Sequence, residues 1–78
     1  MRIEWRKHIT VSPDLHHGEP CLAGTRIPVS MIVGSVADGM TFDEILAGYP
    51  QLTKESIQAA LAYAAEMVRH DIYLPLAG

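Results

Sequence analysis

The spacing of hydrophobic positions changes near Pro28 and divides the chain into two parts. Upstream of Pro28, apolar residues fall at alternate positions, which is typical of a half-buried β-strand, although Lys7 interrupts the pattern. The alternating residues are Ile3, Trp5, Ile9 and Val11. We therefore expect one or two short strands within residues 1–27.

A tight turn is predicted at Ala23-Gly24, between two short extended segments at residues 20–22 and 25–27. Glycine at the second turn position adopts a positive φ angle without the steric penalty that a Cβ atom brings. Residues 1–27 thus predict a short N-terminal β-hairpin or β-arm.

Downstream of Pro28, apolar residues recur at i, i+3, i+4 and i+7, the spacing of an amphipathic helix. A first helix is expected to have Pro28 as its first helical residue and to stop at Gly39. A second helix is expected to open with a capping box of Thr41 and Glu44 and to end at Pro50. The predicted buried stripes are Val29, Ile32, Val33 and Val36 in the first helix, and Phe42, Ile45, Leu46 and Tyr49 in the second.

A third helix is predicted to take Thr53 as its cap and to run to about His70. Its buried stripe is expected to be Ile57, Ala60, Leu61, Ala64 and Val68. The linker at residues 48–52 is longer than the usual turn of a helix-turn-helix, which favours a looser arrangement. We predict a mainly α fold: a three-helix homeodomain-like (helix-turn-helix) domain over residues 28–70, with the short β-arm before it and a tail at residues 71–78.

Composition and charge narrow the class of protein. The 78 residues suit one domain, and 49% hydrophobic with 19% charged residues is a globular composition. The net charge of −3 excludes the strongly basic class that binds nucleic acid by charge alone. One cysteine cannot form an internal disulfide, and no apolar run approaches the ~20 residues of a membrane span. We therefore expect a cytoplasmic protein without a signal peptide or membrane anchor.

The start of the third helix is the candidate DNA-reading surface, because this part of a helix-turn-helix meets base edges. Gln58 is able to pair with adenine, and Lys54 with phosphate or guanine. The candidate residues are Thr53, Lys54, Ser56 and Gln58. The alternative is an ordinary solvated helix face.

The distribution of charge argues against strong binding of duplex DNA by a monomer. Residues 31–78 carry two basic and six acidic side chains, which gives a net charge of −4. DNA binding would then need a dimer, the basic N-terminal segment or a partner protein.

The sequence predicts neither metal binding nor catalysis. His17 and Cys21 have an H-x-x-x-C spacing, but a zinc site would need His8 and His16 as well, so we expect ordinary loop residues and no metal or cofactor. The chain contains no recognisable nucleophile arrangement and is short for a substrate cleft, so we expect no enzyme. The apolar tail either returns to the core or contacts a partner through Tyr73, Leu74 and Leu76.

The run G-x-P-x-x-x-G-T-R-x-P-V at residues 18–29 is the most specific motif, and shorter matches follow at residues 39–41, 44–45, 49–50 and 52–53. Over about residues 8–70, the chain resembles the small bacterial family called domain of unknown function 433. The resemblance implies a homeodomain-like winged or trihelical protein that acts as the antitoxin of a type II toxin–antitoxin pair. Such an antitoxin would neutralise a neighbouring PIN-like ribonuclease toxin and bind operator DNA, and we expect it to do so as a homodimer.

Arg26 lies within this motif, and two roles remain open for it. It would contact phosphate or a partner, or it would anchor the hairpin to a helix C-terminus by charge and hydrogen bonding. For the whole chain, the alternative to the antitoxin is a protein-interaction or homo-oligomerisation module without DNA binding.

Overall fold

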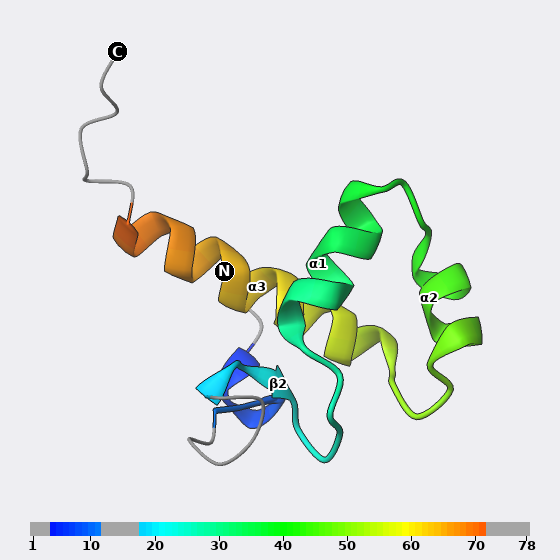
Figure 1. Cartoon of the computed structure of the whole chain (residues 1–78), viewed down its shortest axis with the longest axis horizontal. Coiled ribbons are helices and arrows are strands. Elements are labelled where there is room, and N and C mark those ends of the chain that lie inside the picture. Colours follow the sequence, from blue (N-terminus) through cyan, green and yellow to red (C-terminus); the bar gives the residue numbers. More distant parts are fainter. Residues whose placement is uncertain (1–3, 12–17, 72–78) are drawn as a thin grey trace.

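Three helices and a small antiparallel hairpin make up the computed structural model, which describes residues 4–11 and 18–71 (Figure 1). The elements in chain order are the 3₁₀ helix η1 (Trp5–Lys7), strands β1 (Ile9–Thr10) and β2 (Cys21–Leu22), and helices α1 (Val29–Ala37), α2 (Phe42–Gly48) and α3 (Lys54–Asp71). Helix α1 packs against α3, while η1 and the hairpin lie on another side of α3, whose C-terminal end projects beyond these elements (Figure 1). The predicted fold class, mainly helical with a short N-terminal hairpin, is confirmed.

The hairpin is short because only two residue pairs join its strands. Ile9 pairs with Leu22 and Thr10 with Cys21, in antiparallel register. The predicted turn follows β2: Gly24 has a φ of 76°, which favours glycine. The turn returns the chain so that the Leu22 N–H donates to the Ile27 carbonyl at 2.9 Å.

The ends of α1 are set by the backbone. Pro28 is the N-cap, with φ −67° and ψ 145°, so the helix begins one residue later than predicted. The reason is that Pro28 forms a bridge with Cys21 and is therefore held in an extended conformation. At the other end Gly39 has a φ of 93°, and its N–H donates to the Val36 carbonyl at 3.0 Å, as expected for a glycine that ends a helix.

Helix α2 begins with the predicted capping box. The Glu44 N–H donates to Thr41 Oγ1 at 3.1 Å, and the Thr41 N–H donates to Glu44 Oε1 at 2.8 Å. The helix ends at Gly48, with Tyr49 as its C-cap, directly before Pro50. These local signals were sufficient to predict the element.

Two predictions at the ends of the chain were wrong. Trp5 lies in a 3₁₀ helix rather than a strand, because the His8 N–H closes a turn on the Trp5 carbonyl at 2.9 Å and the indole packs against α3. Val68 was expected in the buried stripe of α3 but is 61% exposed, since it lies on the projecting end of the helix (Figure 1). Ile3, the first residue of the predicted strand pattern, lies outside the described residues.

One apolar core joins the hairpin to all three helices. Ala59 and Ala60 of α3 are fully buried, and their short side chains let neighbouring elements approach the helix axis closely. The core residues are Ile9, Leu22, Ile27, Val29, Ile32, Ile45, Leu52, Ile57, Ala59 and Ala60. Within residues 4–11 and 18–71, no helix is long and apolar enough to cross a membrane.

Candidate functional site

The start of α3 is held by a reciprocal cap between Thr53 and Ser56. The Ser56 N–H donates to Thr53 Oγ1 at 3.2 Å, and the Thr53 N–H donates to Ser56 Oγ at 3.3 Å. The two hydroxyl oxygens lie 3.1 Å apart. Both side chains therefore satisfy backbone groups of the helix end, which is a structural role.

Lys54 and Gln58 lie one helical turn apart and face the same side of α3. Both are exposed, and neither side chain forms a hydrogen bond or ion pair with another described residue. Of the four candidate residues predicted at the start of α3, these two are the ones whose side chains do not cap the helix.

The core fixes the position of this helix start. Leu52 and Ile57 flank it and are both buried, at 6% and 0% exposed. The Leu52 N–H donates to the Tyr49 carbonyl at 3.0 Å, which ties the linker to the end of α2. The exposed side chains of Lys54 and Gln58 are thus presented from a rigid support.

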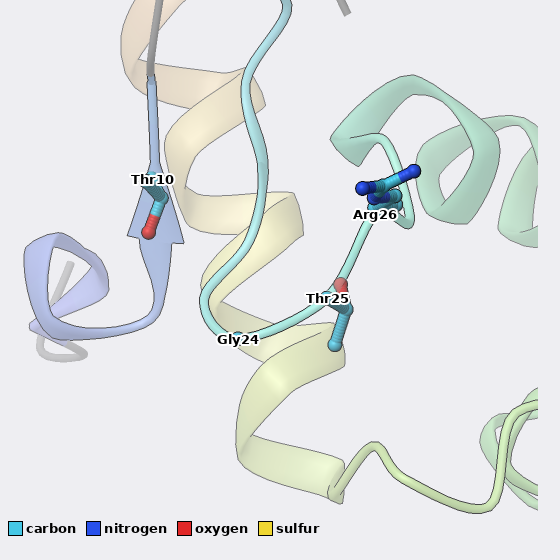
Figure 2. Close-up of a pocket in the computed structure, with 4 residues that line it drawn as sticks. All are labelled: Thr10, Gly24, Thr25 and Arg26. Carbon is cyan, nitrogen blue, oxygen red and sulfur yellow. The ribbon is translucent and has the colours of Figure 1, made fainter. Parts of the chain in front are cut away.

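Arg26 lies on a different element, in the segment between β2 and α1. Its exposed side chain lines an open hollow together with Thr10, Gly24 and Thr25 (Figure 2). In the described part of the chain it has no hydrogen bond or ion pair, so the expected anchor to a helix C-terminus is not formed there. The hollow itself was not predicted, because Thr10 of β1 and the turn after β2 are distant in the sequence and meet only in the folded chain.

The exposed charges of α2 and α3 have both signs. Glu55 is exposed beside Lys54, and the first turn of α2 carries the exposed carboxylates of Asp43 and Glu44. Arg69 is also exposed but lies near the other end of α3. This distribution gives the helix start little attraction for phosphate at long range.

The environment of Cys21 does not suit metal binding or nucleophilic chemistry. Burial raises the pKa of the Cys21 thiol, and the negative charge of Glu19 raises it further. The neutral thiol donates to the Glu19 carbonyl at 3.5 Å. No group of three His, Cys, Asp or Glu side chains that would hold a metal ion is found in residues 4–11 and 18–71, and His16 and His17 lie outside them.

A cluster that the sequence did not predict joins η1 to α3. The Trp5 indole N–H donates to the Glu66 carboxylate, and the Trp5 and Tyr63 rings meet edge to face with centroids 4.9 Å apart. The Arg6 guanidinium lies 4.7 Å from the Trp5 ring centroid and 3.8 Å from a Glu66 oxygen. Sixty-one positions separate Trp5 from Glu66, so no local spacing indicates this contact. The predicted partner-binding residues Tyr73, Leu74 and Leu76 lie outside the described residues.

The fold and the exposed start of α3 define a small three-helix domain of the helix-turn-helix kind. A family model described as "Protein of unknown function (DUF433)" matches residues 9–64, and the chain belongs to this family. It is 41% identical over 59 residues to the "Uncharacterized protein y4eO" of Sinorhizobium fredii; the match covers 76% of this chain but only 27% of that protein. A crystal structure of a DUF433 member from Anabaena variabilis superposes with a TM-score of 0.71 at 34% identity, covering 83% of this chain and 67% of the other.

The cap of α3 leads to a stability prediction. Replacing Thr53 by alanine is expected to lower the free energy of unfolding by about 1 kcal/mol, because the Ser56 N–H loses its acceptor. Urea unfolding followed by circular dichroism measures this loss. Lys54→Ala in the same helical turn is the control, and its expected change is within about 0.5 kcal/mol. An equal loss in both variants would show that the Thr53 hydroxyl does not act as the cap.

Proposed function

We propose that this chain is a non-enzymatic binding protein, the antitoxin and transcriptional regulator of a type II toxin–antitoxin pair. In this proposal it acts in the cytoplasm, neutralises a PIN-like ribonuclease toxin encoded nearby, and binds operator DNA as a homodimer. The observation that carries the proposal is the exposed, polar start of α3, presented on a rigid trihelical scaffold. The family resemblance supplies the type of partner.

The chemistry of the two available side chains supports reading of DNA. The Gln58 amide is able to donate to and accept from the major-groove edge of adenine. One turn earlier, the Lys54 ammonium suits a phosphate or the acceptors of guanine. Thr53 and Ser56 contribute by fixing the helix end from which these side chains project.

The charge of the domain sets a condition on this binding. A helical half with a net charge of −4 gives a monomer little affinity for duplex DNA. A two-fold dimer doubles the number of Lys54 and Gln58 side chains on a palindromic site. The toxin partner would add further contacts, so we expect the complex to bind its operator more tightly than this chain alone.

The test is a DNA-binding titration at several salt concentrations, using the DNA upstream of this gene, with and without the product of the adjacent gene. Lys54→Ala should weaken binding to all sequences and reduce the salt slope by about 1. Gln58→Ala should cost about 1–3 kcal/mol and relax the preference at one adenine position. Arg69→Ala is the control, because it removes an exposed cation at the far end of α3.

Unchanged binding of the Lys54 and Gln58 variants would remove α3 as the reading helix. The toxin part of the proposal is tested separately by co-purification of the two gene products and by ribonuclease activity with and without this chain. An adjacent nuclease that neither co-purifies nor loses activity would contradict it.

The acidic helical surface favours a second candidate function. Exposed carboxylates at Asp43, Glu44 and Glu55 suit contact with a basic, nucleic-acid-binding protein rather than with DNA. In that case the chain is a protein-interaction module without DNA binding. The same titration separates the two functions, since this module binds the partner but leaves DNA unbound at every salt concentration.

A further inference from the structure

One cationic and two hydroxyl-bearing side chains line the hollow beside the β2–α1 turn. It is lined by Thr10, Gly24, Thr25 and Arg26, and none of these lining residues is acidic. Figure 2 shows Thr10 on β1, Gly24 at the tip of the turn, and Arg26 on the segment that leads into α1. Strand β1 and the segment between β2 and α1 thus meet at one open surface feature.

The cation of this hollow is available for a ligand. Arg6, on η1, is paired with Glu4 at 3.5 Å and with Glu66 at 3.8 Å. Arg26 has no such partner among the described residues. Its planar guanidinium presents several N–H donors in a fixed fork that matches the oxygens of a phosphate group.

The turn adds backbone donors next to this cation. In the described part of the chain, the N–H groups of Gly24 and Arg26 have no hydrogen-bond acceptor, whereas the Thr25 N–H between them donates to the Leu22 carbonyl at 3.0 Å. A Cβ atom at Gly24 would meet nothing within 4 Å, so the space over this part of the backbone is open. Gly24 is itself exposed, so this part of the turn is accessible from solvent.

The turn is also held in one conformation before any ligand arrives. The Thr25 hydroxyl donates to the Leu22 carbonyl at 2.8 Å and accepts from the Ile27 N–H at 3.0 Å. Leu22 and Ile27 are buried in the core on either side of the turn. The Thr25 side chain thus fixes the geometry. The Thr10 hydroxyl, on an exposed residue, forms no hydrogen bond with another described residue.

From these observations we propose that the hollow binds a phosphate group, with the Arg26 guanidinium and the Gly24 and Arg26 N–H groups as donors and Thr10 as a further contact. The group is either free phosphate or a backbone phosphate of nucleic acid. Binding of a nucleic-acid phosphate rests on the proposed function, whereas the existence of a phosphate site does not.

Inorganic phosphate is the first probe. The ¹⁵N-labelled protein is titrated with sodium phosphate at constant ionic strength, and with sodium chloride in parallel. Saturable shifts of the Gly24 and Arg26 amide signals are expected with phosphate only. Arg26→Gln should weaken this binding about tenfold or more, because the charge-assisted hydrogen bonds are lost. Arg69→Gln removes the same charge from an exposed arginine elsewhere and should leave the affinity unchanged.

The proposal is overturned if phosphate and chloride shift the same signals equally, or if Arg69→Gln weakens binding as much as Arg26→Gln. Thr10→Val gives a second check, because it keeps a β-branched side chain of similar shape and removes the hydroxyl. A modest loss of phosphate affinity is expected there. The dispersion of the amide spectrum shows in the same experiment whether each variant is folded.

A short DNA duplex and the matching single strand identify the source of the phosphate. If DNA shifts the Gly24 and Arg26 amides and Arg26→Gln reduces the salt slope of DNA binding by about 1, the hollow holds a backbone phosphate. If inorganic phosphate binds but DNA does not, the hollow is a site for free phosphate. The DNA-binding part of the proposed function is then contradicted, while the phosphate site is supported. If DNA binds without shifting these amides and inorganic phosphate does not bind, the phosphate site is contradicted. The proposal that α3 binds DNA is not affected by this result.

Discussion

Replacing Ile57 by alanine should lower the free energy of unfolding by about 2–5 kcal/mol, since the change opens a cavity in a small core. Ile57 is 0% exposed and belongs to the cluster that joins the hairpin to all three helices. A domain of this size has a total stability of about 5–10 kcal/mol, so the substitution should remove a large share of it. Urea unfolding of both proteins, followed by circular dichroism, measures the difference.

Val68→Ala is the matched control for Ile57→Ala. Both positions belong to the apolar stripe predicted for α3, but Val68 is 61% exposed in the structure. Its truncation removes little buried surface, and alanine is the better helix former, so the expected change is within about 0.5 kcal/mol. A large loss at Val68 that depends on protein concentration would mean that another chain covers the end of α3. A small loss at Ile57 would contradict the core described above.

The helices were predictable because their ends carry local signals. The capping box at Thr41 and Glu44 and the positive φ of Gly39 depend on residues within one or two turns of each other. The buried stripes of α1 and α2 follow from spacing in the same way. Short-range patterns therefore predicted the element order and most boundaries.

The errors arose where distant contacts decide the structure. Trp5 continues an alternating pattern, yet its ring packs against Tyr63, and this contact favours a compact turn over a strand. Val68 continues a helical pattern beyond the point where other described elements cover α3. Periodicity indicates which face of an element is apolar, but it does not say how far the neighbouring elements extend.

Part of the candidate site was also predictable from local patterns, and part depends on contacts that only the structure shows. The position of Thr53, Lys54, Ser56 and Gln58 at an exposed helix start was predictable from the third helix alone. The mutual cap of Thr53 and Ser56 reduces the available side chains to two, which only the hydrogen bonds reveal. The hollow around Arg26 depends on β1 lying beside a turn that follows β2. The motif was therefore sufficient to select Arg26 but not to predict which residues surround it.

Trp5→Ala is expected to have the second large effect, a loss of about 2–4 kcal/mol in the free energy of unfolding. The substitution removes the edge contact with Tyr63, the indole hydrogen bond to Glu66 and the ring beneath Arg6. Full truncation of a core aromatic costs about 3–5 kcal/mol, and Trp5 is half-buried, so a somewhat smaller loss follows. Urea unfolding against the unmodified chain measures it.

Trp5→Phe separates the contribution of the aromatic ring to stability from that of the indole N–H group. The phenyl ring keeps an aromatic contact with Tyr63 but leaves the Glu66 carboxylate without this donor, so we expect about half of the loss seen in Trp5→Ala. Because η1 leads directly into β1, weakening its contact with α3 should also loosen Ile9 and Thr10, which faster amide exchange in β1 would show. If Trp5→Ala unfolds at the same urea concentration as the unmodified chain, η1 is not held on α3, and Thr10 then lacks the support that places it at the hollow.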